Sequence, residues 1–206
     1  MKKIKDNIIE ILVVAGVMLI LLYSSSPDIY PDTQRFLSGN LHDPPLYSTI
    51  IYVMQLIFGS LNSVIILQTL FVGFGIIYFT RTVEIHFNLN VMIKSIIALF
   101  LFLPVLKFYK SLITEPISYA FSLLFVSFVV KLIYNLKIKN IIWITIFVIL
   151  LLLLRNQFIF LYPVILLLYL GILILYSSKK TFSWLLISFL SIFIIHNVTI
   201  STNKHI

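Results

Sequence analysis

Seven apolar segments follow one another along the chain and leave only one long polar stretch between them. They span residues 8–24, 62–80, 91–106, 116–134, 141–154, 157–176 and 181–198. Hydrophobic residues make up 61% of the sequence and charged residues 11%, whereas a soluble domain carries about a quarter charged residues. A bilayer core about 30 Å thick is crossed by about 20 apolar residues in a helix. The pattern therefore predicts an all-α, polytopic membrane bundle of about seven spans, forming one transmembrane domain over residues 1–206.

Two stretches of this pattern can each be interpreted in two ways. Residues 141–176 are almost continuously apolar, and a single helix of that length would be much longer than the bilayer core is thick. Arg155-Asn156-Gln157 interrupts the run near its middle, so we expect a tight hairpin there. The first run follows Lys2 and Lys3 and could be a signal peptide, but its length favours an uncleaved first span.

The basic residues predict an orientation. The net charge is +8, with 15 Lys and Arg against seven acids. With the N-terminus inside, the inner set is Lys2, Lys3, Lys5, Arg81, Lys94, Lys131, Lys137, Lys139, Lys179 and Lys180, and the outer set is Arg35, Lys107, Lys110, Arg155 and Lys204. This excess favours an N-terminus inside the cytoplasmic membrane and a C-terminus outside. In a membrane protein, such an excess of Lys and Arg over acidic residues marks cytoplasmic loops rather than nucleic-acid binding.

The composition also excludes several kinds of site. There is no cysteine, so disulfides, thiolate zinc sites and cysteine nucleophiles are ruled out. The four histidines are scattered and form no paired metal-binding motif.

The polar stretch over residues 25–61 is the first candidate for a functional site. Three of the seven acids lie in it: Asp28, Asp32 and Asp43. Pro31 and Asp32 suit a first helical turn and Gly39-Asn40 a stop, which predicts a short helix near 31–38. Asp43 suits an N-cap, Pro44 a first turn and Gly59 a helix end, which predicts a second helix.

The second helix is expected to lie in the membrane interface. Ser48, Tyr52, Gln55 and Gly59 form a polar stripe on an otherwise apolar helix, as interfacial helices do. The alternative is a short additional span, which would invert all of the following topology. The distribution of basic residues argues against that alternative.

Four stretches resemble, in order, motifs of the GT-C superfamily of membrane glycosyltransferases, which includes the dolichyl-phosphate-mannose-protein mannosyltransferase-like and aminoarabinose-transferase-like proteins. They are Tyr30-Pro-Asp-Thr-Gln-Arg-Phe36, Asp43-Pro-Pro-Leu-Tyr47, Leu112-Ile-Thr-Glu-Pro116 and Leu151-Leu-Leu-Leu-Arg-Asn156. Phe36 and Asn156 stand where the family pattern has Tyr and Pro. Members of the family are longer chains, so the resemblance is to their N-terminal part. A truncated, split or minimal enzyme would each fit.

The resemblance implies an inverting transfer of a sugar from a polyprenyl-phosphate donor to an acceptor glycan, lipid or protein at the outer face of the membrane. Asp32 would be the catalytic base and Glu115 an acceptor or metal contact. Arg155, Lys107 and Lys110 would bind the lipid phosphate, and Tyr47 would contact substrate. Such chemistry needs a carboxylate near the acceptor hydroxyl and fixed positive charge near the departing phosphate.

Each of these residues also has a simpler interpretation. Asp32 and Glu115 could only stabilise helix N-termini, Glu115 with Thr114 as its cap. Arg155 could be an arginine at a hairpin tip that reaches for water, and the two lysines ordinary flanking charges. Two carboxylates could also hold a divalent cation, although two acids alone are weak evidence for metal.

Two other classes of protein compete with the enzyme. A transporter or flippase would carry ionisable groups within its spans and show internal repeats. The spans here are nearly free of acids and no repeat is visible. A non-catalytic membrane subunit or an inactive remnant is the second alternative.

Overall fold

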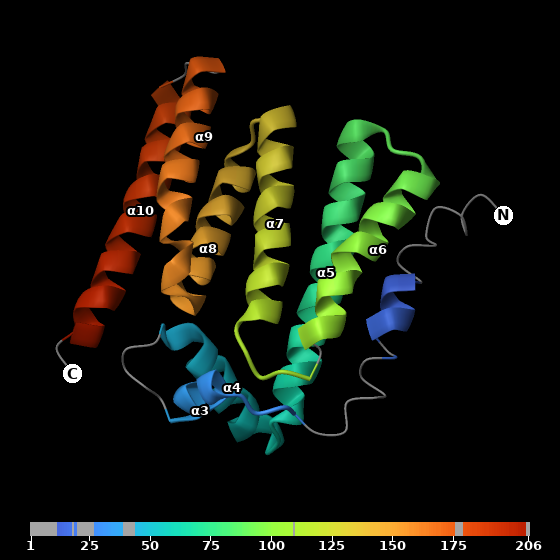
Figure 1. Ribbon diagram of the computed structural model, residues 1–206. Coiled ribbons are helices and arrows are strands. Elements are labelled where there is room, and N and C mark those ends of the chain that lie inside the picture. The colour runs from blue at the N-terminus through green and yellow to red at the C-terminus, as the bar shows by residue number, and fades with distance from the viewer. Residues whose placement is uncertain are drawn as a thin grey trace.

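The computed structural model describes residues 12–17, 19, 27–38, 44–108, 110–175 and 179–204. Every regular element in these ranges is a helix, which confirms the predicted all-α class (Figure 1). The elements are α3 Pro31–Leu37, α4 Pro45–Phe58, α5 Asn62–Phe87, α6 Val91–Phe108, α7 Glu115–Tyr134, α8 Ile138–Leu154, the 3₁₀ helix η1 Asn156–Phe160, α9 Leu161–Leu175 and α10 Lys179–Lys204. Residues 12–17 are also helical.

Five of these segments are long and apolar enough to cross a membrane: Asn62–Phe87, Val91–Phe108, Glu115–Tyr134, Asn156–Ile174 and Thr181–Thr199. The chain is therefore a multi-pass membrane protein. Two of the seven expected spans are not among the five. Helix α8 has 17 residues and is about 26 Å long, slightly less than the bilayer core. The first expected span, 8–24, is described only at residues 12–17 and 19.

The predicted hairpin at Arg155 is confirmed. Helix α8 ends at Leu154, and Arg155 is extended, with φ −153° and ψ 131°. The following residues form η1 instead of continuing an α-helix, and α9 then runs back beside the bundle (Figure 1). A polar, extended residue therefore divides what the sequence presents as one apolar run.

The turn between α5 and α6 lies at the opposite end of the bundle from Arg155. Helix α5 extends beyond its predicted end at residue 80 and stops at Asn88, which adopts a left-handed conformation with φ 52°. Lys94 of α6 is buried there, and its Nζ lies 2.7 Å from a carboxylate oxygen of Glu84. This ion pair joins the last turns of α5 to the first turn of α6 and neutralises a buried lysine.

Helix α7 is the central element of the bundle, with α5 on one side and α8 on the other (Figure 1). Glycine allows α5 and α7 to approach closely. A Cβ added to Gly75 would lie 3.2 Å from the carbonyl oxygen of Ala120. Close backbone contact at small residues is the usual way in which membrane helices associate.

Replacing Gly75 with Ala should therefore destabilise the bundle, because the backbone of Ala120 cannot move aside as a flexible side chain would. We expect Gly75→Ala to lower the free energy of unfolding by about 1 kcal/mol, measured by thermal unfolding in detergent. Gly171→Ala is the matched control: an added Cβ there meets nothing within 4 Å, and Ala favours the helix. Equal stability of the two variants would contradict this account of the α5–α7 contact.

Helices α3 and α4 lie at one end of the bundle, across the ends of the longer helices (Figure 1). Both were predicted. Helix α4 starts one residue later than expected, with Pro44 extended before it, and ends at Gly59 with φ 65°. The predicted cap Asp43 and stop Gly39-Asn40 lie outside the described residues.

The predicted polar stripe on α4 lies among exposed apolar side chains. The face that packs against the protein carries Tyr47 and Ile51, both buried. Tyr52 and Gln55 do face outward, but large apolar side chains surround them, including Leu56 and Phe58. The outward face of α4 is therefore mainly apolar, because the sequence places apolar residues on more than one side of this helix.

Candidate functional site

Two irregular segments far apart in sequence are joined by hydrogen bonds. The Asp28 N–H donates to the Lys110 carbonyl at 2.9 Å, and the Leu112 N–H donates to the Asp28 carbonyl at 3.4 Å. These bonds form an isolated parallel bridge between Asp28 and Ser111. The first loop and the loop before α7 therefore run side by side. Asp28 contributes through its backbone.

Thr33 adds a side-chain bond to the same junction. Its buried hydroxyl donates to the Leu112 carbonyl at 2.8 Å and accepts from the Tyr30 N–H at 3.1 Å. The first turn of α3 is therefore fixed against the segment that leads into α7. Asp32, one residue earlier, is brought close to Glu115 by this junction. Thr33 lies within the family-like motif of residues 30–36, but it was not selected because only its neighbour Asp32 matches the family's acid.

A cavity of about 380 Å³ lies at this junction and is called the Asp32 cavity here. It is lined by Tyr30, Pro31, Asp32, Lys107, Phe108, Ser111, Ile113 and Glu115. The Asp32 side chain is 60% exposed, and one of its oxygens lies 3.6 Å from Nη1 of Arg35. Such an exposed pair holds its carboxylate weakly. Two carboxylates and a lysine, from three separate parts of the chain, therefore border one space.

Glu115 makes the strongest polar contact of the site. Its Oε1 lies 2.6 Å from Nη1 of Arg155, and both side chains are about one-third exposed. Glu115 is the first residue of α7, where the helix dipole favours a negative charge. Thr114 was expected to cap this helix, but its hydroxyl donates to Oε2 of Glu115 at 3.4 Å and makes no cap bond.

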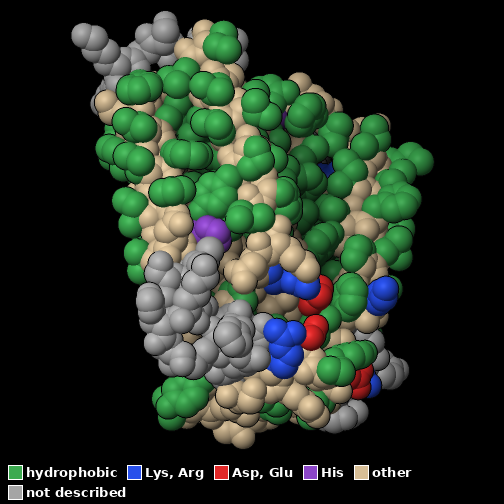
Figure 2. Space-filling model, turned by 60° about the vertical axis from the view of Figure 1, so that its left-hand side comes forward, with side chains coloured by type: hydrophobic (Ala, Val, Ile, Leu, Met, Phe, Trp, Pro, Cys, Tyr) green, Lys and Arg blue, Asp and Glu red, His purple; other side chains and the backbone are tan. Residues whose placement is uncertain are grey.

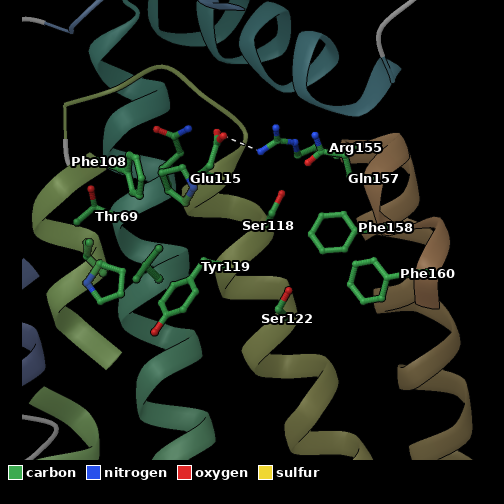
Figure 3. A pocket seen from close by; sticks show the side chains of 15 residues that line it. Thr69, Phe108, Glu115, Ser118, Tyr119, Ser122, Arg155, Gln157, Phe158 and Phe160 are labelled. Atoms are coloured by element: carbon green, nitrogen blue, oxygen red, sulfur yellow. Dashed lines mark hydrogen bonds and ion pairs between the residues drawn. The ribbon is translucent and has the colours of Figure 1, made fainter. Parts of the chain in front are cut away.

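A second cavity, of about 340 Å³, runs along α7 and is called the α7 groove here (Figure 3). Helix α7 forms its floor, α5 and α6 one wall, and the α8–α9 turn the other. Its lining is Gln68, Thr69, Val72, Pro104, Val105, Phe108, Glu115, Pro116, Ser118, Tyr119, Ser122, Arg155, Gln157, Phe158 and Phe160. Phe108 and Glu115 border this groove and also the Asp32 cavity.

The α7 groove is largely apolar below its charged mouth. The Tyr119 hydroxyl donates to the Leu101 carbonyl at 2.7 Å, and the Thr69 hydroxyl donates to Ile65 within α5. Phe158 and Phe160 form the opposite wall (Figure 3). The arrangement suits a molecule with a long apolar part and a polar or charged end.

The structure brings together four of the six expected site residues. Asp32, Lys107 and Glu115 border the Asp32 cavity, and Glu115 and Arg155 border the α7 groove. The ammonium of Lys107 also lies 5.4 Å from the ring centre of Phe108. Asp32 and Arg155 thus lie on different cavities, and Glu115 is the charged group that the two spaces share.

Lys110 and Tyr47 line neither cavity. Helix α6 ends at Phe108, so Lys110 is in the following turn and does not share a helical face with Lys107, as the sequence had led us to expect. Tyr47 is fully buried, and its hydroxyl accepts a hydrogen bond from Nε2 of Gln68 at 2.7 Å. Burial raises the pKa of the Tyr47 phenol above its usual value, so it remains protonated inside the protein.

Gln68 is a site residue that sequence reasoning missed. It is buried in α5, donates to Tyr47 and to the Ile113 carbonyl at 2.8 Å, and borders the α7 groove. It links α4, α5 and the segment before Glu115. A lone glutamine within an apolar run was the available signal, because buried amides in membrane helices are costly unless they bond to something.

The donor groups fit a divalent cation poorly. Within the described ranges, no group of three or more His, Cys, Asp and Glu side chains comes together. The two carboxylates of the Asp32 cavity each already face an arginine, Arg35 and Arg155 respectively. We therefore derive no step through a metal.

Charged side chains gather toward the end of the molecule that carries α3 and α4, below a broad hydrophobic surface (Figure 2). The two arginine–carboxylate pairs lie at this end. Comparison with known proteins finds no matching family model, no matching curated relative and no matching solved structure.

The Thr33 hydroxyl should contribute more to the stability of the fold than the hydroxyl of an exposed threonine does. We expect Thr33→Val to lower the free energy of unfolding by about 2 kcal/mol, because it removes the partner of the buried Leu112 carbonyl and of the partly buried Tyr30 N–H. Thr49→Val is the matched control: Thr49 is exposed and bonds only within its own helix. Thermal unfolding in detergent compares the two, and equal melting temperatures would remove Thr33 as the link between the loops.

Proposed function

We propose that this protein is an inverting glycosyltransferase that moves a sugar from a polyprenyl-phosphate donor to an acceptor hydroxyl at the membrane surface. One observation carries the proposal: Glu115 borders both an apolar groove with an arginine at its mouth and a polar cavity with a second carboxylate. A lipid-linked donor and a polar acceptor need two such spaces, meeting at one point.

The α7 groove supports the donor half of this proposal. Its apolar walls suit a polyprenyl chain, and Arg155 stands where the chain would end in its phosphate. A guanidinium binds phosphate oxygens through two parallel hydrogen bonds. Lys107, which borders the adjoining cavity, supplies a second positive charge.

The Asp32 cavity supports the acceptor half. Asp32 takes the proton of the acceptor hydroxyl, and the hydroxyl oxygen attacks the anomeric carbon of the sugar from the side opposite the phosphate. The bond from that carbon to the phosphate oxygen breaks, and its electron pair remains on the phosphate, where Arg155 and Lys107 stabilise it. Glu115 orients the acceptor. Lys110 and Tyr47 have no part in this step.

Loss of the Asp32 base should then lower the rate and leave the fold intact. We expect Asp32→Asn to reduce sugar transfer by a factor of about 100 or more, measured with a radiolabelled polyprenyl-phosphate sugar in reconstituted vesicles. Asp28→Asn is the matched control, because Asp28 joins the two loops through backbone atoms. It should transfer sugar at the wild-type rate.

The outcome also separates the alternatives. Equal transfer by wild type and Asp32→Asn would remove Asp32 as the base. Absence of transfer from every donor by the wild-type chain would favour a non-catalytic membrane subunit.

The proposal includes an orientation in the cytoplasmic membrane. Seven spans with an inside N-terminus, and α3 and α4 in the interface, would place both cavities on the outer side. The basic residues support this, since the end opposite the cavities carries Arg81, Lys94, Lys131, Lys137, Lys139, Lys179 and Lys180, and the end with the cavities carries Arg35, Lys107, Lys110, Arg155 and Lys204. Positive charge is enriched on the cytoplasmic side.

Because the chain has no cysteine, single cysteines can report this orientation directly. Ser38→Cys lies after α3, at the end with the cavities, and Asn135→Cys lies after α7, at the other end; both sites are exposed. We expect a membrane-impermeant maleimide to label Ser38→Cys on intact cells and to label Asn135→Cys only after the membrane is opened. The reverse pattern would place the site inside.

A further inference from the structure

Ser118 has a buried hydroxyl without a hydrogen-bond partner in the part of the chain that the structure describes. Its residue is 5% exposed, and it lines the α7 groove. Other buried hydroxyls on these helices, such as those of Thr80 and Ser127, donate to the carbonyl one turn earlier. A buried hydroxyl that makes no hydrogen bond lowers the stability of the fold unless a ligand or water binds it.

The position of Ser118 indicates what that partner is. It lies three residues after Glu115, on the same face of α7, and its hydroxyl points toward the Glu115–Arg155 pair (Figure 3). A group bound by Ser118 in this part of the groove would therefore lie close to the Arg155 guanidinium. A hydroxyl donor beside a guanidinium suits an anionic oxygen.

Arg155 already holds an anion in this structure, the carboxylate of Glu115. An incoming anion must therefore compete with Glu115 for the same guanidinium. The displaced Glu115 carboxylate can turn toward the Asp32 cavity, which it also borders. The apolar walls of the groove favour an anion that is attached to a lipid over a free one.

We infer that the α7 groove receives a phosphate oxygen between Ser118 and Arg155, and that this phosphate replaces the Glu115 carboxylate on Arg155. The inference rests on the proposed function, because it takes the groove as the donor site. Its consequence is an order of events. Donor binding releases Glu115 toward the Asp32 cavity, so the acceptor contact becomes complete only after the donor has bound.

Binding of a fluorescent polyprenyl phosphate to the purified full chain in detergent tests the exchange, with the matching polyprenol and inorganic phosphate as competitors. Glu115→Gln should bind polyprenyl phosphate several-fold more tightly than wild type, because the competing charge is gone. Ser118→Ala should bind it about tenfold more weakly, the loss of one hydrogen bond to a charged group. Ser127→Ala, the same change at a buried serine of α7 that lines neither cavity, should bind like wild type.

Several results would overturn the inference. Unchanged affinity in Ser118→Ala, or no gain in Glu115→Gln, contradicts the exchange. If Glu115→Gln does not fold, Glu115→Asp, whose carboxylate is withdrawn by one methylene, should show the same gain. If the polyprenol competes as well as polyprenyl phosphate does, the groove makes no contact with the phosphate. If inorganic phosphate competes equally well, the bound phosphate need not belong to a lipid.

The assay uses no sugar and is therefore independent of transfer. Binding with the expected pattern in a chain that transfers no sugar would leave the exchange standing and remove the proposed reaction. The opposite result would be sugar transfer by the wild-type chain together with unchanged polyprenyl-phosphate affinity in Ser118→Ala and Glu115→Gln. That result would leave the proposed reaction standing and remove the exchange.

Discussion

Backbone N–H and carbonyl groups that a fold buries must find hydrogen-bond partners, and two irregular segments of this chain do so by bonding to each other. The bonds of Asp28 with Lys110 and Leu112, and of Thr33 with Leu112, satisfy groups that neither segment satisfies alone. They also align the start of α3 with the start of α7. Both cavities border residues that this junction positions, so the geometry of the site depends on it.

Helix α7 transmits that alignment to the rest of the molecule. Its first residue bonds to Arg155 at the α8–α9 turn, and further along it meets α5 at the glycine contact of Gly75 with Ala120. The groove floor is thus held against α5 by close backbone packing and at its mouth by an ion pair. Rigid elements of this kind suit a site in which charged groups must be held in place before a ligand arrives.

The sequence was sufficient for features that depend on local chemistry. The length of each apolar run predicted most helices, Arg155 predicted the break between α8 and α9, and Gly59 predicted the end of α4. The boundaries that failed involve competition between neighbouring residues, as with two successive prolines at the start of α4. The side of α4 that packs against the bundle could not be predicted, because burial is set by the helices it meets and residue pattern alone could not choose between Tyr47 and Leu56.

The site was only partly predictable for the same reason. Family-like motifs selected Asp32, Glu115 and Arg155, but spacing in sequence could not say that the first two share one cavity and the last two another. Thr33, Gln68 and Ser118 went unselected, since each acts through a partner more than 30 positions away or through an empty space. Lys110 was overestimated because the end of α6 at Phe108 removes the helical register that would have paired it with Lys107.

A single carboxylate that borders two spaces has a thermodynamic consequence. Any ligand that changes where Glu115 resides in one cavity changes the affinity of the other cavity, and the effect is equal in both directions. An occupant of the Asp32 cavity that attracts Glu115 would therefore hold the guanidinium of Arg155 open for an anion as effectively as the anion holds Glu115 open for that occupant. Cooperativity between the two substrates would then need no moving domain, only one side chain with two partners.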